Sequence, residues 1–328
     1  MVFFGSSPPV KSVGRVTIIR VVSLFLLIFI CSYAFADRKP HVLFVVSKSS
    51  ADYVEVLNGV QERLEAQSPG AYEFTARFRA PRLNLKPDLA KADFVVSIGT
   101  AAADLAFSHQ PKVPIISVLI TENAFSVLAK KYYGSIEDAF AAQVSSVCLD
   151  QPVTRSIELA KLVIPKVSKV GVMLGPASIS RAAALGKYIV DTDLHPQFVN
   201  IDTKDNPILK IEPVLSRSDV FIPISDSRLI NIATAKWILH LSYRHKVPVI
   251  AFSKSYLKAG ALAAIYSSPV DVARDTVDWF ANSRASTAGG LYKPTHYSLN
   301  FNKSVAANLQ IELKPDQFYR DYLSKETR

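Results

Sequence analysis

Cysteine is scarce in this chain, with only Cys31 and Cys148 among 328 residues. Cys31 lies in an N-terminal segment that we expect to be removed, so the mature chain would keep one cysteine and could form no intrachain disulfide. Cys148 lies in the apolar run VSSVCL. We therefore expect it to be a small core residue rather than a reactive thiol.

Motifs for common enzyme chemistry are also missing. The sequence contains no GxGxxG or GxxxxGK[ST] phosphate-binding loop and no GxSxG nucleophile motif. His240 and His245 are five residues apart, which places them on different faces of a helix and does not predict a zinc pair. Asp271 and Asp275 lie one helical turn apart, and we expect both to be solvated. The sequence therefore predicts no catalytic residue, no metal, no cofactor and no enzymatic activity.

Basic residues are in excess, with a formal net charge of +10, but no basic tract is interleaved with aromatic residues. Three of these charges precede residue 37, and the rest are spread along the chain. This distribution argues against nucleic-acid binding and is compatible with mild attraction to an anionic membrane surface.

One apolar run stands out, Val21–Cys31, with three basic residues before it and Ala34-Phe35-Ala36 after it. This order predicts a secretory signal peptide over residues 1–36, cleaved after Ala36, and a periplasmic protein. A retained membrane anchor is the alternative, although a full span requires about 20 apolar residues. Phe29 and Ile30 precede Cys31 where lipidation sites have small residues, so lipidation is not favoured.

After residue 36, strand and helix patterns alternate in two successive arrays. The first has expected strands at 41–47, 72–78, 93–99 and 113–120, and the second has them at 169–175, 196–201, 219–225 and 247–253. Such alternation predicts an α/β protein with two Rossmann-like lobes built on parallel sheets. Further elements are expected at 261–267, 269–285, 296–302 and 303–311. Residues 315–328 form a C-terminal tail, either a docking helix or a loose end.

Several of these segments, in order, resemble a known family. They include VVSKSSADYVEVLNGVQERL, ADFVVSIGTAAADLA, VPIISVLIT, DVFIPISDS and YSLNFNKSVAANLQI. Their order over residues 40–314 resembles that of ABC-transporter substrate-binding proteins of the tryptophan/tyrosine type, in a proteobacterial branch with uncertain ligands. Ser146, Gln310 and the Thr121-Glu122-Asn123 segment depart from the family pattern, so the identity of the ligand is not carried over.

The resemblance implies the type I periplasmic-binding fold, with three hinge crossings near 145–150, 254–260 and 288–296. Lobe one would contain residues 37–147 and 258–288, and lobe two would contain 148–257 and 289–314. It also implies a monomer that binds a small ligand, such as an amino acid or another small carboxylate, and docks on the membrane permease of an importer. A ligand-sensing accessory protein that signals to a membrane receptor is the alternative.

Ligands of open parallel sheets bind at the carboxyl ends of the strands. In this sequence those ends are mostly small or hydroxylic residues, which suits an apolar pocket with a few oriented polar groups. The predicted ligand-binding residues are Ser47, Ser49, Gly99, Thr100, Ala101, Thr121, Glu122, Pro176, Asp226 and Ser253.

Two roles are predicted more specifically. Thr100 is expected to cap the helix that begins after Gly99, which would leave the amides of Ala101 and Ala102 free to bind a ligand carboxylate. Its alternative role is only to cap that helix. Glu122 and Asp226 are expected to meet a ligand amine, with two solvated loop acids as the alternative.

Overall fold

The structure is a computed structural model that describes residues 1, 5, 38–226, 229–283 and 289–326. The chain divides into two units, residues 1–40 and 41–328, and the fold below is that of the second. The predicted signal peptide and its cleavage site lie outside the described residues. Within the part of the chain that is described, no helix has both the length and the apolar character needed to cross a membrane.

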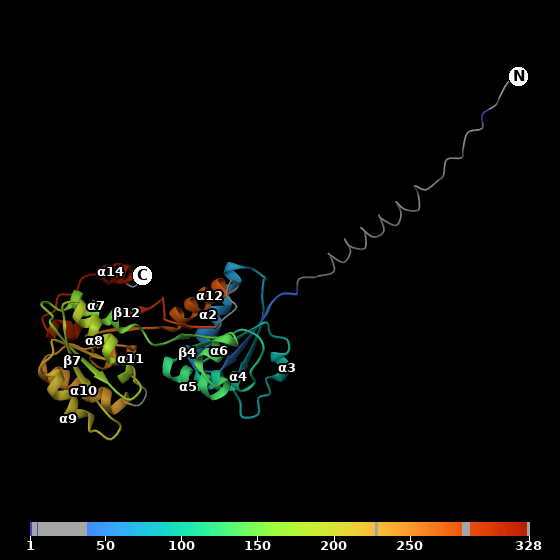
Figure 1. Ribbon diagram of the computed structural model, residues 1–328. Helices are drawn as coiled ribbons and strands as arrows, with labels where there is room; N and C mark the ends of the chain where they lie inside the picture. Colours follow the sequence, from blue (N-terminus) through green and yellow to red (C-terminus); the bar gives the residue numbers. More distant parts are fainter. Residues whose placement is uncertain (2–4, 6–37, 227–228, 284–288, 327–328) are drawn as a thin grey trace. The chain divides into compact units, whose positions relative to one another are not determined.

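The first sheet has the strand order β11-β5-β4-β3-β1-β2, and every pairing in it is parallel. This sheet and its helices are called lobe one here (Figure 1). Its elements are β1 His41–Val46, α2 Ala51–Gln67, β2 Glu73–Phe78, α3 Lys86–Leu89, β3 Phe94–Ile98, α4 Thr100–Ser108, β4 Ile115–Ile120, α5 Glu122–Tyr133, α6 Ile136–Ala141, β5 Val144–Cys148, α12 Pro269–Ser283 and β11 Leu291–Tyr292.

Both faces of this sheet are covered, which explains why the inner strands β1, β3 and β4 are largely apolar runs. In β1, Val42, Phe44 and Val46 pack with the helices α2 and α12, while Leu43 and Val45 pack on the opposite face with α4, α5 and α6. Successive side chains of a strand point to opposite faces, so both sets must be apolar. Helix α12 lies beside α2 (Figure 1) although about 200 residues separate them in sequence.

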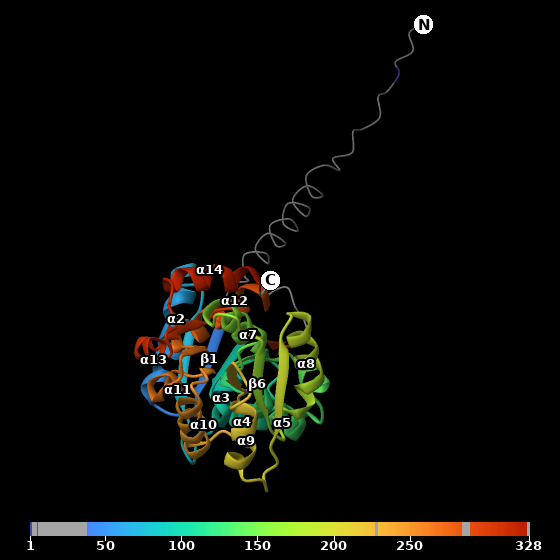
Figure 2. The same ribbon diagram turned by 90° about the vertical axis from the view of Figure 1, so that its left-hand side faces the viewer.

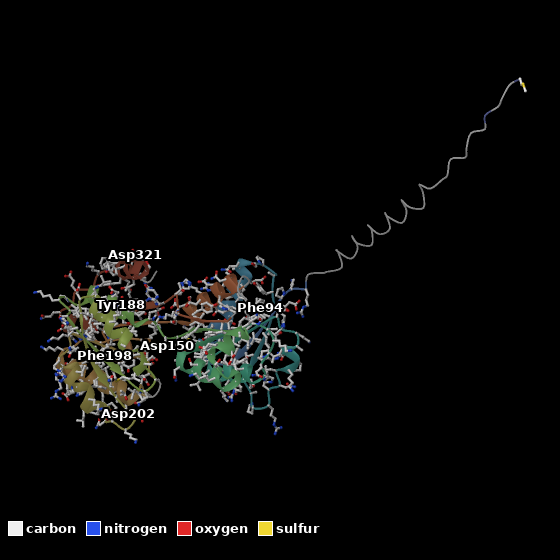
Figure 3. The ribbon with its side chains drawn as sticks, in the orientation of Figure 1. Phe94, Asp150, Tyr188, Phe198, Asp202 and Asp321 are labelled. Atoms are coloured by element: carbon white, nitrogen blue, oxygen red, sulfur yellow. The ribbon has the colours of Figure 1, made fainter. Side chains whose placement is uncertain are left out.

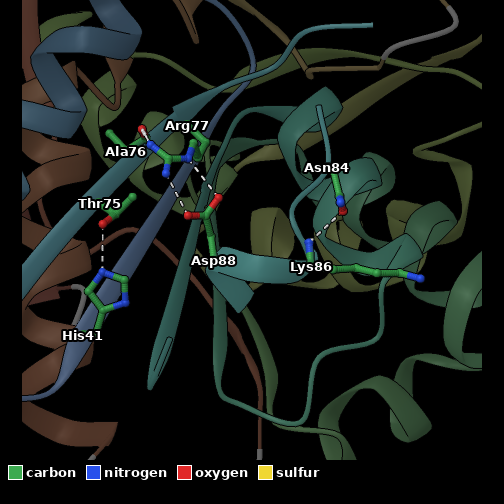
Figure 4. Close-up of polar contacts among 7 residues, drawn as sticks. All are labelled: His41, Thr75, Ala76, Arg77, Asn84, Lys86 and Asp88. Atoms are coloured by element: carbon green, nitrogen blue, oxygen red, sulfur yellow. Dashed lines mark hydrogen bonds and ion pairs between the residues drawn. The ribbon is translucent and has the colours of Figure 1, made fainter. Parts of the chain in front are cut away.

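Short helix α3 is fixed to the sheet edge by a bidentate ion pair. Arg77 of β2 donates from Nε and Nη2 to the two carboxylate oxygens of Asp88, each at 2.8 Å (Figure 4). Nearby, the His41 ring nitrogen Nε2 lies 2.8 Å from Thr75 Oγ1 and links β1 to β2. These contacts join α3 to β2 and β2 to β1 at one edge of the first sheet.

The second set of strands, called lobe two here, forms two three-stranded sheets, β7-β6-β8 and β12-β10-β9. A parallel bridge between Phe221 and Val249 joins them. All pairings are parallel except that of β12 with β10. Its elements are α7 Val153–Val163, β6 Lys169–Leu174, η1 Ile179–Arg181, α8 Ala182–Asp191, β7 His195–Asn200, α9 Pro207–Leu215, β8 Val220–Pro223, α10 Ile232–His245, β9 Ile250–Ala251, α11 Lys254–Ala259, β10 Ala263–Tyr266, β12 Ser298–Phe301, α13 Lys303–Asn308 and α14 Asp316–Glu326.

Helices also cover both faces of lobe two. Helices α7 and α8 contact each other and pack with Val170, Val172 and Leu174 of β6, whereas α9 and α10 pack with Met173 on the other face (Figure 2). The C-terminal tail includes the docking helix α14, which buries Tyr319 and Leu323 in the same core as α7. The alternation of strands and helices therefore gives two layered α/β lobes.

The chain crosses between the lobes at 149–152, 267–268 and 293–297. The predicted second crossing near 254–260 is wrong, because β10 pairs with β9 and β12 and so belongs to lobe two. The second segment of lobe two was predicted to begin at residue 289. This boundary is also wrong, because β11 pairs with β5 and so belongs to lobe one. The residues of an apolar strand do not show which of two sheets the strand pairs with.

Candidate functional site

A cavity of about 280 Å³, called the hinge cavity here, lies at the carboxyl ends of β4, β5, β8, β9 and β10. It includes residues of the first two crossings, and its volume is just below the usual range of small-molecule pockets. Its lining residues are Thr121, Leu149, Asp150, Gln151, Val153, Ser156, Arg181, Ile222, Pro223, Ile224, Ser225, Phe252, Ser253, Lys254, Tyr266 and Ser267.

The carboxylate of the hinge cavity comes from Asp150, which follows β5 in the first crossing (labelled in Figure 3). Its side chain is half-buried, and its Oδ2 accepts the backbone N–H of Glu122 at 2.7 Å. Burial raises the pKa of Asp150, while this hydrogen bond and the positive charge of Arg181 act in the opposite direction. Asp150 is therefore an acid that gains from a cationic partner.

The guanidinium of the hinge cavity comes from Arg181 at the end of η1. Its Nη2 lies 2.9 Å from Glu122 Oε2, so the ion pair joins lobe two to α5 of lobe one. Both side chains are about one third exposed, at 34% and 37%. Ion pairs with this exposure contribute roughly 0–1 kcal/mol, so a ligand carboxylate could replace Glu122 as the partner of Arg181.

The rest of the lining combines apolar surface with hydroxyl groups. Phe252 and Tyr266 supply aromatic rings, and the Tyr266 hydroxyl donates to Asn300 Oδ1 at 2.9 Å. Hydroxyls of Thr121, Ser156, Ser225, Ser253 and Ser267 also line the cavity. Such a lining suits a ligand with an apolar side chain and a few polar groups.

Polar contacts at this cavity and beside it join the crossings. Gln151 Nε2 donates to Ser267 Oγ at 2.7 Å, which links the first crossing to the second. Arg155 of α7 is 4% exposed, donates to Gln151 Oε1 and to the Pro294 carbonyl, and stacks on the Tyr297 ring with Cζ 4.2 Å from the ring centroid. These contacts therefore link the three crossing segments to one another.

Helix α12 contributes two buried acids to the same region. Asp271 accepts hydrogen bonds from Ser268 and from the Ser298 hydroxyl, and burial raises the pKa of Asp275 to about 6. Both acids are 5% exposed. The expectation that Asp271 and Asp275 are solvated is therefore wrong. The second crossing and β12 contact Asp271, and the third crossing contacts Asp275.

Three predicted site residues lie at the hinge cavity or beside it. Thr121 lines it and caps α5 by accepting the Ala124 N–H at 3.2 Å. Ser253 lines it and caps α11. Glu122 pairs with the lining residue Arg181. The strand-end rule thus identified residues from both lobes that the fold brings together.

The predicted residues after β1 and β3 lie outside the hinge cavity. Gly99, not Thr100, is the N-cap of α4, so the predicted capping role of Thr100 is wrong. The amide of Ala102 donates to Ser47 Oγ at 2.8 Å, so it is not free for a ligand as predicted. Ser49 is exposed, and Ala101 is half-buried at the first turn of α4.

Pro176 and Asp226 lie at strand ends of lobe two but not in the lining of the hinge cavity. Asp226 is 1% exposed, and its Oδ2 accepts from the Ala177 N–H at 3.0 Å and the Ser178 hydroxyl at 2.8 Å. The side chain therefore holds the loop after β6, and Pro176 is half-buried within that loop.

Sequence reasoning missed Asp150, Gln151, Arg181, Phe252 and Tyr266. Asp150 could have been found, because LDQP directly follows the strand VSSVC and obeys the same strand-end rule. Arg181 lies seven residues beyond the end of β6. The sequence does not show that the chain comes back to the carboxyl ends of the strands at this position.

A model of the family described as ABC transporter substrate binding protein matches residues 84–279, more than half of the chain. The chain belongs to this family. Members are substrate-binding proteins of ABC transporters and are typically extracytoplasmic, and their role is binding rather than catalysis. The matched region includes the lining residues of the hinge cavity from Thr121 to Ser267.

Individual relatives are more distant. A tyrosine-binding protein of Clostridioides difficile is 23% identical over 176 residues, which are 53% of this chain. The match spans about half of that curated relative, 49% of its length.

Solved structures support the fold. The ligand-free, open structure of a substrate-binding protein with adhesive properties from Clostridium difficile is 16% identical and has a TM-score of 0.61, covering 85% of this chain and 97% of that one. A Streptococcus pneumonia ABC domain in complex with L-Trp is 16% identical and has a TM-score of 0.53, covering 86% and 98% of the two chains. The chain thus has the type I periplasmic-binding fold of this family, with two α/β lobes and three crossings.

Proposed function

We propose that this protein is the extracytoplasmic binding component of an ABC importer and that it captures a small α-amino acid with an apolar or aromatic side chain. The supporting observation is the pairing of opposite charges at one apolar cavity: the Asp150 carboxylate and the Arg181 guanidinium both line it. An amino acid carries the complementary pair, an ammonium and a carboxylate, on one carbon atom.

The proposed binding mode assigns one role to each charge. The ligand ammonium would lie against Asp150, whose burial makes a cationic partner favourable. The ligand carboxylate would take the place of Glu122 on Arg181. Phe252 and Tyr266 would contact the ligand side chain. The names of the tyrosine-binding relative and of the L-Trp complex support this ligand class.

Closure of the two lobes would complete the site. Hinge motion about the three crossings would bring the N-terminus of α4 toward the ligand, so that the Gly99–Ala101 turn adds backbone donors to its carboxylate. We propose that the closed form docks on a membrane permease and that residues 1–36 direct export to the periplasm. When the ligand binds, the Glu122–Arg181 ion pair that joins the lobes would break and contacts with the ligand would replace it.

Calorimetric titration with matched ligands tests the proposal. L-Tyr and L-Trp should bind saturably, whereas tyramine lacks the carboxylate and 3-(4-hydroxyphenyl)propionate lacks the amine, so both should bind weakly. Arg181→Gln and Asp150→Asn should each raise the Kd of the amino acid about 10- to 100-fold, which corresponds to roughly 1.4–2.7 kcal/mol.

Exposed residues of the same types provide controls. Arg82→Gln and Asp52→Asn change exposed side chains of lobe one that do not line the hinge cavity, and they should leave the Kd unchanged. An amine-free or carboxylate-free analogue that binds as tightly as the amino acid would contradict the two-charge mode. Failure of every amino acid to bind would reject the proposed ligand class.

A further inference from the structure

Three side chains with metal-binding chemistry meet on the lobe-one side of the third crossing. Asp275 and Asp278 lie one turn apart on α12, and His296 lies in the 293–297 segment that leads from β11 to β12. One ligand-type atom of each residue lies within 4.8 Å of the other two, and His296 Nε2 is 2.8 Å from Asp278 Oδ2. The amino-acid site proposed above uses none of these residues.

The buried member of this cluster has an unused oxygen. Asp275 is 5% exposed, and its Oδ1 accepts the N–H groups of Thr295 and His296, each at 3.0 Å. Its Oδ2 is buried and has no hydrogen-bond partner. A buried carboxylate oxygen without a partner is costly, and native structures rarely leave one without a reason.

The nearby guanidinium of Arg155 attracts the Asp275 carboxylate but forms no ion pair with it. Arg155 donates to Gln151 Oε1 and to the Pro294 carbonyl, and its guanidinium is stacked on Tyr297. Among the described residues, no ion pair within 4.0 Å joins Arg155 to Asp275, and the guanidinium Nε is itself without a partner. The free oxygen of Asp275 is therefore open to another cation.

We propose that Asp275, Asp278 and His296 bind a divalent transition-metal ion of the Zn²⁺ type. Two carboxylates and one imidazole match Zn²⁺, which takes such ligands at about 2.0–2.2 Å. Hard ions such as Mg²⁺ prefer oxygen ligands throughout, so the imidazole favours a transition metal over them. The ion would replace the proton between His296 and Asp278 and would also satisfy the buried oxygen of Asp275.

The exposure of the three ligands suits such a site. The Asp278 and His296 side chains are 53% and 35% exposed, so an ion can enter from solvent and a water molecule can complete a tetrahedron. Asp275 anchors the inner side. No metal was predicted from the sequence. Asp275 and His296 are 21 residues apart and form no local motif, and only the path of the third crossing brings them together.

The bound ion would join α12 of lobe one to the segment that enters lobe two. It would therefore stabilise the third crossing, and the apparent stability of the protein would increase with the free metal concentration. This consequence gives the site a readout that does not depend on the amino-acid ligand.

The test uses purified, tag-free protein that has been treated with a chelator and dialysed. Calorimetric titration with Zn²⁺ should show one saturable site, and Zn²⁺ should raise Tm, whereas Mg²⁺ should do neither at the same concentration. Co²⁺ should bind competitively with Zn²⁺ and give visible absorption bands. His296→Gln and Asp278→Asn should each weaken Zn²⁺ binding by about tenfold or more.

Both substitutions are at accessible side chains, so the variants should fold, and their melting curves in chelator check this. His240→Gln removes an exposed histidine of α10 and should leave the Zn²⁺ affinity unchanged. Absence of saturable Zn²⁺ binding would overturn the proposal. Equal Zn²⁺ affinity in wild type and in a folded His296→Gln variant would also overturn it. Neither result bears on amino-acid binding, which is measured separately.

Discussion

Gly99 shows how one residue shapes the turn between β3 and α4. Its φ is 92°, in the left-handed region where glycine is favoured, and it serves as the N-cap of α4. An added Cβ would lie 2.4 Å from Tyr53 Cε1 and 2.6 Å from Ser47 Oγ. The glycine therefore permits both the backbone conformation and the close approach of Ser47, whose hydroxyl accepts the Ala102 N–H.

We expect Gly99→Ala to lower the free energy of unfolding by about 1–3 kcal/mol, because the substitution combines positive-φ strain with overpacking. Urea denaturation measures the change. Gly260→Ala is the matched control: its φ is 122°, but its Cβ would meet nothing within 4 Å, so it adds strain without a clash. Equal losses in the two variants would show that the contacts with Tyr53 and Ser47 do not matter.

Single residues also show what sequence reasoning can and cannot identify. Cys148 was predicted as a core residue, and the structure confirms this with 4% exposure; burial raises the pKa of its thiol to about 12. Thr121 and Ser253 were placed at strand ends from the sequence, and both line the hinge cavity, while their role in ligand binding stays a prediction. Asp226 was placed at the right strand end, but no pattern shows that its carboxylate faces the Ser178 loop.

At the scale of elements, the apolar runs of the sequence predicted most strands close to their observed bounds. In helix α2, Tyr53, Val56, Leu57, Val60 and Leu64 recur at helical spacing; Tyr53 is half-buried and the other four are buried. Short elements were missed: β11 has two residues and α11 has six, which is too few for a periodic pattern. Strand order also stays hidden, because it depends on pairing between distant segments.

The N-terminus of α4 carries a prediction at this scale. Thr100 is the first helical residue, a position where proline is tolerated because its N–H has no partner within the helix. Thr100→Pro should therefore change the free energy of unfolding by less than about 0.5 kcal/mol.

The same substitution removes an amide donor that, in the proposed closed form, faces the ligand carboxylate. The Kd of an amino-acid ligand should rise about tenfold, which calorimetric titration measures. Thr100→Ala keeps the amide and should bind as wild type does. Unchanged affinity in a folded Thr100→Pro variant would remove the Gly99–Ala101 turn from the proposed site.

At the scale of the whole molecule, the three crossings decide how the two lobes act together. Sequence analysis predicted two α/β lobes with three crossings, but it placed the second crossing too early. The reason is physical: ALAAIYS would be equally well buried in either sheet, and only its pairing with β9 and β12 assigns it to lobe two. The hinge cavity, which includes residues of two crossings, was therefore only partly predictable.

Arg155 links the first crossing to the third and supports the last prediction. The side chain is 4% exposed, donates to Gln151 Oε1 and to the Pro294 carbonyl, and stacks on Tyr297. Arg155→Met keeps much of the apolar stem but removes the guanidinium. We expect the free energy of unfolding to fall by about 2–4 kcal/mol, because charge-assisted hydrogen bonds in a buried site are lost and their partners stay buried. Urea denaturation of Arg155→Met beside the exposed control Arg82→Met measures this, and a loss no larger than that of the control would show that the crossings are held by apolar packing alone.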